Sequence, residues 1–214
     1  MSNNFINFYC KGWRRSLCFI LLVLAAMFSL SWIMQVLSDE PEIALIYDEP
    51  WEDMRQRSSA VIDPAIPGHF WFHIPDSDAR LRFIDPKYGF TTPLARFFTI
   101  SFGDERVRDI RMSPQTEPLL LDDALKVVLD LQDQWRQQGW HLTSRRNNYA
   151  FEDTPEWRTQ FRDINKGGTA FWQAEDKYQV MLLLHRFKDN KRPNEERYMI
   201  TLALSRPWVP SHED

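Results

Sequence analysis

Cysteine and glycine are scarce in this chain, and their absence excludes several kinds of site. The 214 residues include two cysteines, Cys10 and Cys18, so the chain beyond them has no disulfide, thiol nucleophile or cysteine-ligated zinc. The seven glycines, at positions 12, 68, 89, 103, 139, 167 and 168, do not form a phosphate loop, a dinucleotide fingerprint or a G-x-S-x-G nucleophile elbow. We therefore predict no catalytic residue and no cofactor.

Charge is absent from residues 17–37, a stretch of 21 residues. As a helix rising 1.5 Å per residue, it would be about 31 Å long, which matches the roughly 30 Å hydrocarbon core of a bilayer. The flanking charges are Lys11, Arg14 and Arg15 before the stretch, and Asp39, Glu40 and Glu42 after it. Because basic loops stay cytoplasmic, we predict a single-pass signal-anchor in the inner (plasma) membrane. Residues 1–16 would then be cytoplasmic, 38–41 a linker and 42–214 a periplasmic domain.

A cleaved signal peptide is the alternative to a retained anchor. Ser29 and Ser31 are small residues at the −3 and −1 positions of a cleavage site before Trp32. We favour the anchor because the apolar stretch continues through Leu37.

The region after the stretch is acidic. The whole chain has 26 basic and 30 acidic residues, and three of the basic ones precede residue 17, which leaves 23 against 30, or −7. This balance argues against nucleic acid as a partner. The length suits one domain with its own hydrophobic core.

Periodicity predicts an α+β fold, with one antiparallel-sheet domain, one long helix and two short helices. Apolar residues three and four apart predict the long helix at 122–138, ended by Gly139. Short helices are expected at 49–57 and from the cap residue Thr154. Strands are expected at 41–48, 70–74, 79–84, 96–102, 106–112, 140–144, 169–175, 178–187 and 197–205. The strands at 96–102 and 106–112 are expected to form a hairpin, because both alternate and Gly103 and Asp104 lie between them. Residues 180–184 are apolar on both faces, which predicts that their strand is central.

Residues 48–102 and 153–204 share one order of elements: short helix, loop, glycine, aromatic strand, turn and strand. Residues 48–57 align with 153–162, 68–84 with 168–184, and 94–102 with 195–204. Trp71 and Trp172 are 101 residues apart, and so are Arg96 and Arg197. Either an internal duplication or a chance resemblance between ordinary hairpin segments explains this pattern.

His69 and His73 are the only pair with a spacing typical of metal ligands. Pro67, Gly68 and Pro75 place them in a strand, where side chains four residues apart are about 13 Å apart. We therefore predict no metal site.

Aromatic side chains and two polar loops are the candidates for binding a partner. The aromatic candidates are the run Phe70–Trp71–Phe72 with Trp51, mirrored by Phe171–Trp172 with Trp157. We expect most of these residues to pack in the core and one or two to be exposed as anchors for a partner or a sugar. The loops are 188–197, with mixed charges, and the polar tip at 145–147. The candidate residues are Trp51, Trp71, Trp157, Trp172, Arg145, Arg146, Lys191 and Arg192.

Three classes of function remain. The first is a membrane-anchored extracytoplasmic protein-binding module without catalysis, such as an immunity or inhibitor protein against a basic toxin that acts in the periplasm, since opposite charge speeds association. The second is a subunit or assembly factor of a bacterial envelope or secretion complex. The third is an unrecognised cell-wall hydrolase. We favour the first class.

Overall fold

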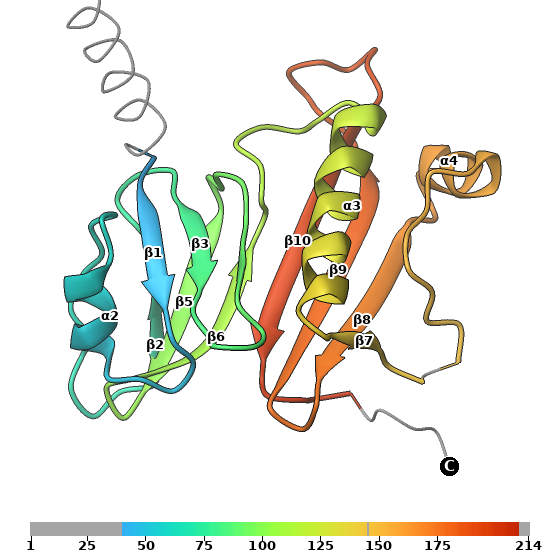
Figure 1. Ribbon diagram of the computed structural model, residues 1–214. Helices are drawn as coiled ribbons and strands as arrows, with labels where there is room; N and C mark the ends of the chain where they lie inside the picture. The colour runs from blue at the N-terminus through green and yellow to red at the C-terminus, as the bar shows by residue number, and fades with distance from the viewer. Residues whose placement is uncertain (1–39, 145, 210–214) are drawn as a thin grey trace, which may run out of the picture. The chain divides into compact units, whose positions relative to one another are not determined.

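The protein is described by a computed structural model over residues 40–144 and 146–209 (Figure 1). The predicted membrane anchor lies outside these residues. No helix within them has both the length and the apolar character needed to cross a membrane. The chain from Pro41 onward forms one folded unit of the α+β class, with three helices in its described part.

The predicted helices and strands occur in the predicted order along the chain, and the structure adds a short strand at Phe90–Thr91 that was not predicted. The helices are α2 (Trp51–Arg57), α3 (Leu121–Gln137) and α4 (Pro155–Arg162). The strands are β1 (Glu42–Leu45), β2 (Trp71–His73), β3 (Arg80–Phe83), β4 (Phe90–Thr91), β5 (Phe98–Gly103), β6 (Arg106–Met112), β7 (His141–Leu142), β8 (Gly168–Ala174), β9 (Tyr178–Phe187) and β10 (Arg197–Ser205).

Two predicted features are confirmed: the cap of α4 by Thr154 and the hairpin of β5 and β6. The hydroxyl of Thr154 accepts a hydrogen bond from the Trp157 amide at 3.3 Å, so Thr154 caps α4. β5 and β6 form the predicted antiparallel hairpin, in which Thr99 pairs with Arg111.

The strands form two sheets, where the sequence predicted one. Seven strands form an antiparallel sheet in the order β2-β5-β6-β10-β9-β8-β7, and β1, β3 and β4 form a smaller sheet. β1 and β3 are parallel, so the fold is mostly rather than wholly antiparallel. Glu42 on β1 joins the two strands, because its carboxylate binds Arg80 at 3.1 Å and Arg82 at 2.6 Å.

The strands predicted at 70–74 and 79–84 follow one another in the sequence but lie in different sheets. β2 pairs with β5 in the large sheet, whereas β3 pairs with β1 and β4. Leu81 and Phe83 are buried on β3, so its apolar face contributes to the core from the small sheet.

The core lies between the large sheet and a layer made of α3 and the small sheet. α3 packs on β9 and β10 (Figure 1) and buries Leu125, Val128 and Trp135. From the small sheet, the ring of Phe83 packs edge-on against Tyr178 of β9, with centroids 5.1 Å apart. Burial alternates along β10, as expected for a strand with one face toward this core.

The middle strand of the large sheet is β10, and the prediction that residues 180–184 form the central strand is wrong. β9 is adjacent to β10. Val180, Leu182 and Leu184 face the core, while Met181 and Leu183 are half-buried on the opposite face. The opposite face has apolar neighbours of its own, since Met181 pairs with Phe171 and Ala203.

Candidate protein-binding surface

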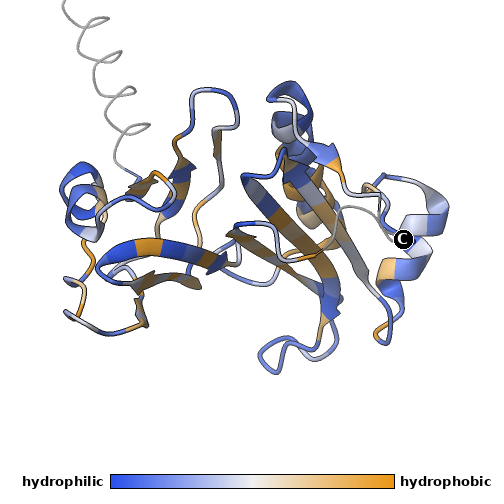
Figure 2. Ribbon diagram, turned by 90° about the horizontal axis from the view of Figure 1, so that it is seen from below, coloured by the Kyte–Doolittle hydropathy of each residue, from blue (hydrophilic) through white to orange (hydrophobic). Residues whose placement is uncertain are grey.

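β2 is an edge strand of the large sheet and carries a group of exposed apolar side chains. The exposed fractions are 70% for Phe70, 55% for Trp71, 42% for Phe72 and 50% for Ile74. We call these four residues the edge patch. Figure 2 shows the sheet from below, with hydropathy along each strand. Contiguous exposed apolar residues on an edge strand are unusual, because such edges promote association with other chains.

Local sequence explains why the edge patch is both extended and short. Gly68 has a φ of +72°, a left-handed conformation that glycine adopts at little cost, and it turns the chain into β2. Pro75 is buried just after Ile74 and cannot donate a backbone hydrogen bond, so it ends the strand.

The aromatic rings of the edge patch are held in place by close contacts. Trp71 stacks on Phe72 with ring centroids 5.4 Å apart and an interplanar angle of 17°. A Cβ atom at Gly103 would lie 2.9 Å from Cδ2 of Phe70, so glycine at this position allows the Phe70 ring to lie against β5. The patch therefore presents ordered rings to solvent.

Acidic side chains lie beside the edge patch. Asp104 and Glu105 are exposed and follow Gly103, the residue that contacts Phe70. Asp76 is exposed two residues after Ile74, and its amide donates to the Val61 carbonyl at 2.9 Å.

A fourth acidic residue, Asp63, is also exposed at this edge. It is next to Pro64, whose carbonyl lies 3.0 Å from Nε2 of His73 on β2. We call Asp63, Asp76, Asp104 and Glu105 the acidic rim. Arg108 offsets part of this charge, because it contacts Asp104 at 3.4 Å while also binding Asp48 at 3.0 Å.

Of the four tryptophans predicted as candidates, only Trp71 is mainly exposed. Trp51 is 1% exposed; it packs against Phe102 and donates to the Asp63 carbonyl at 2.9 Å. Trp172 is 2% exposed and lies 5.8 Å from Trp135. Trp157 is half-buried and stacks on Phe161. Trp51 and Trp172 are therefore core residues.

The charged candidates do not gather at one site. Arg146 is exposed and lines a hollow of about 420 Å³ with Asn147, Asn148, Thr169 and Phe171. Lys191 is exposed, and Arg192 binds Glu117 at 2.6 Å. Arg145 lies outside the described residues.

Sequence reasoning missed Ile74 and the acidic rim. A signal for exposure was present, because alternate residues of a strand face opposite sides and three consecutive aromatics cannot all face one core. The acidic rim left no such signal, since its members come from three separate loops.

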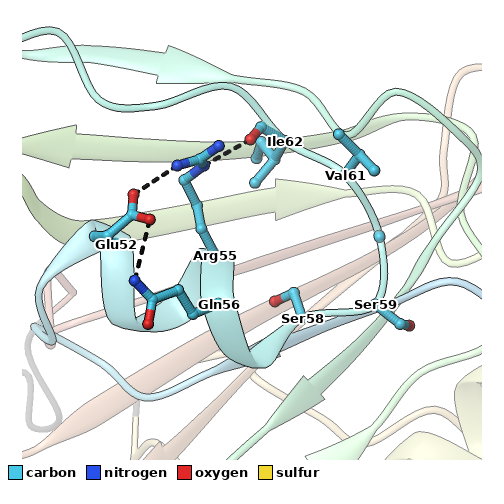
Figure 3. A pocket seen from close by; sticks show the side chains of 8 residues that line it. Glu52, Arg55, Gln56, Ser58, Ser59, Val61 and Ile62 are labelled. Atoms are coloured by element: carbon cyan, nitrogen blue, oxygen red, sulfur yellow. Dashed lines mark hydrogen bonds and ion pairs between the residues drawn. The ribbon is translucent and has the colours of Figure 1, made fainter.

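A second hollow, of about 270 Å³, lies between α2 and residues 58–62 (Figure 3). Its charged groups already bind one another: Glu52 accepts from Arg55 at 2.6 Å and from Gln56 at 3.3 Å. Nε of Arg55 also donates to the Ile62 carbonyl at 2.8 Å. These contacts stabilise the turn after α2 and leave little polar capacity for a ligand.

The histidines contact the backbone rather than each other. Nδ1 of His69 lies 2.9 Å from the Pro67 carbonyl, and His73 contacts Pro64 as described above. Burial lowers the pKa of His185 below its usual value. Within residues 40–144 and 146–209, no three or more His, Cys, Asp or Glu side chains are grouped as metal ligands.

One carboxylate, Asp85, is tightly bound in the turn between β3 and β4. Burial tends to raise its pKa, but the amides of Lys87 and Tyr88, both at 2.8 Å, and the Tyr178 hydroxyl at 3.0 Å outweigh burial and lower it. Burial and the same hydrogen bond raise the pKa of Tyr178 to about 12. Asp85 therefore acts as a structural anion in this turn.

Comparisons with models of protein families, with curated proteins and with solved structures gave no match.

Proposed function

We propose that this protein is a non-catalytic protein-binding module and that it binds its partner through the edge patch. The observation that carries the proposal is the exposure of four neighbouring apolar side chains, two on β2 and one on each side of it. Tryptophan and other large apolar residues supply much of the binding energy at protein interfaces. Trp71 already stacks on Phe72, which reduces the side-chain entropy that these two rings would lose on binding.

Residues 17–37 would hold this module at the inner membrane, with the N-terminus in the cytoplasm and the domain in the periplasm. The proposal rests on the uncharged 21-residue stretch and on the basic residues before it. Within this arrangement, the favoured role is an immunity or inhibitor protein against a periplasm-acting toxin. The net acidic charge of the domain supports a basic partner, because opposite charges increase the rate of association.

We also propose that the domain arose by internal duplication. α2 precedes β2, which lies outside β5 and β6; likewise α4 precedes β8, which lies outside β9 and β10 (Figure 1). The two sets of strands meet at β6 and β10 in mirrored order. This order favours matching β5 with β9, whereas the sequence alignment matched residues 94–102 with 195–204.

The binding proposal is tested by isolating the full chain from detergent-solubilised membranes, as wild type, Trp71→Ala and Tyr149→Ala. Tyr149 is the matched control, since it is an aromatic side chain that is 62% exposed on a loop outside β2. We expect a stoichiometric partner to co-purify with wild type and Tyr149→Ala, and its recovery to fall at least tenfold with Trp71→Ala. Equal recovery with all three chains would refute the role of the edge patch.

The immunity role needs a second measurement. The partner should be a soluble basic protein that harms cells from the periplasm, and cells producing the wild-type chain should survive it better than cells producing Trp71→Ala. A set of integral membrane proteins in place of such a toxin would contradict this role.

A further inference from the structure

The free edge of β2 indicates how a partner binds as well as where it binds. We propose that the partner adds an extended strand to the large sheet beside β2, and that this strand is basic. This inference rests on the proposed function, because it specifies the partner of the same surface.

The first argument is the difference between the two edges of the large sheet. At the β7 edge, the side-chain amide of Asn148 donates to the Phe171 carbonyl at 2.9 Å and accepts from its amide at 2.8 Å. This side chain closes the edge of β8 beyond the two-residue strand β7. Among the described strands, only β5 pairs with β2, so the outer edge of β2 has no neighbouring strand.

The second argument is that β2 lacks a common protection of edge strands. Charged side chains on an edge normally discourage strand addition. Residues 70–74 read Phe-Trp-Phe-His-Ile and carry no acidic, lysine or arginine side chain. An added strand would pair its backbone with β2 and pack its own side chains on the exposed rings.

Because β2 is short, backbone hydrogen bonds can supply only part of the affinity for an added strand. The strand has three residues, so an added strand would gain only a few backbone hydrogen bonds. The exposed rings on both sides of the edge must therefore supply most of the affinity. This makes side-chain substitutions within the edge patch a sensitive test.

The third argument is the negative charge of the acidic rim, which favours a basic partner. The acidic rim has two members at the Gly103 end of the patch and two beside its other end, at Asp63 and Asp76. Lysine or arginine side chains flanking an apolar core of the added strand would meet carboxylates at both ends. Because the rim is exposed, the attraction should weaken with salt, as the Debye length falls below about 10 Å above 0.1 M.

The test uses the full chain in the cells that produce it, with the photoreactive amino acid p-benzoylphenylalanine at Phe72 or, as a control, at Tyr149. We expect irradiation to join position 72 to another protein, through a segment that is extended and carries net positive charge. Raising the NaCl concentration of permeabilised cells from 0.1 to 0.5 M should lower the yield several-fold. Position 149 should not join to the same segment.

Charge substitutions at Trp71 supply the matched comparison. Lysine and glutamate have similar lengths, and Trp71 is 55% exposed, so thermal unfolding should show that both variants fold. With p-benzoylphenylalanine at Phe72, Trp71→Lys should reduce cross-linking at least tenfold more than Trp71→Glu. Equal losses would overturn the basic partner.

Other outcomes overturn the inference in distinguishable ways. A cross-link from position 72 to a second copy of this chain would mean that the edge mediates self-association. A cross-link to a helical or acidic segment would exclude a basic added strand. Cross-links from position 149 with none from position 72 would leave the protein-binding function in place and refute the edge. No cross-link to a protein at either position would refute both.

Discussion

Replacing Trp172 by alanine should mainly lower stability, whereas replacing Trp71 by alanine should mainly weaken binding. The two residues are 101 residues apart and belong to corresponding aromatic strands of the sequence repeat, yet Trp71 is 55% exposed and Trp172 is 2% exposed. Trp172 lies between Trp135, at 5.8 Å, and the Arg136 guanidinium, at 5.3 Å from its ring. The comparison therefore measures how much a tryptophan contributes to stability in β2 and in β8.

The magnitudes follow from burial. Truncating a buried tryptophan removes its transfer free energy and leaves a cavity, which together cost about 3–5 kcal/mol. For a domain of this size, about 3 °C is lost per kcal/mol, so Trp172→Ala should lower the midpoint of thermal unfolding by roughly 10 °C. Trp71→Ala leaves no enclosed cavity, and we expect a loss of about 1 kcal/mol, or roughly 3 °C.

The assay is thermal unfolding of the full chain in detergent, followed by far-ultraviolet circular dichroism. Trp172→Phe is the control, because it keeps an aromatic ring and removes an indole N–H that has no hydrogen-bond partner among the described residues. It should cost less than half as much as Trp172→Ala. Equal destabilisation by Trp71→Ala and Trp172→Ala would refute the assignment of β2 to an exposed edge.

Three further substitutions test other parts of the structure. Gly168→Ala should lower the free energy of unfolding, measured with urea, by about 1–3 kcal/mol, because its Cβ would lie 2.6 Å from Cε1 of Phe151. Gly68→Ala should lower it by only about 1 kcal/mol, because a Cβ there has nothing within 4 Å and the cost comes from the φ of +72°. A larger loss with Gly68→Ala than with Gly168→Ala would contradict the packing at Gly168. Asp85→Asn should destabilise by about 1 kcal/mol at pH 7 after allowance for solvent screening. Because folding lowers the pKa of Asp85, this difference should shrink as the pH of the urea titration falls below about 4, and a constant difference would exclude the ionised carboxylate as its source. The side chain of Gln179 accepts from the amide of Val209 at 2.9 Å and donates to its carbonyl at 2.8 Å. Gln179→Met removes both hydrogen bonds, so limited proteolysis after Ser205 should become several-fold faster. Unchanged cleavage would show that Gln179 does not hold this segment.

Elements that are stabilised mainly by residues close in the sequence could be predicted. α3 has an apolar stripe at helical spacing, and α4 has both Thr154 as a cap and Pro155 in its first turn. The hairpin of β5 and β6 needs only a tight turn between two alternating strands. In each case, neighbours in the sequence supply the contacts that stabilise the element.

Features set by distant residues were not predictable. The parallel pairing of β1 with β3 joins segments about 40 residues apart, as in the contacts of Glu42 with Arg80 and Arg82, and nothing near Glu42 in the sequence indicates this. The two sheets follow from that pairing. The central place of β10 likewise depends on β6 pairing with its second edge across a long sequence separation.

Gly68 and Gly168, which align in the sequence repeat, show why the exposure of the edge patch could be predicted only in part from the sequence. Gly68 serves a left-handed turn in open space, whereas Gly168 makes room for the rings of Phe151, Trp157 and Phe161. Those rings belong to α4 and to the segment before it, and they cover the start of β8. Phe70, Trp71 and Phe72 at β2 are exposed, whereas Trp172 of β8 is buried. Exposure of the edge patch therefore depends on which elements pack against its strand, and the proposed added strand should bury part of it on binding.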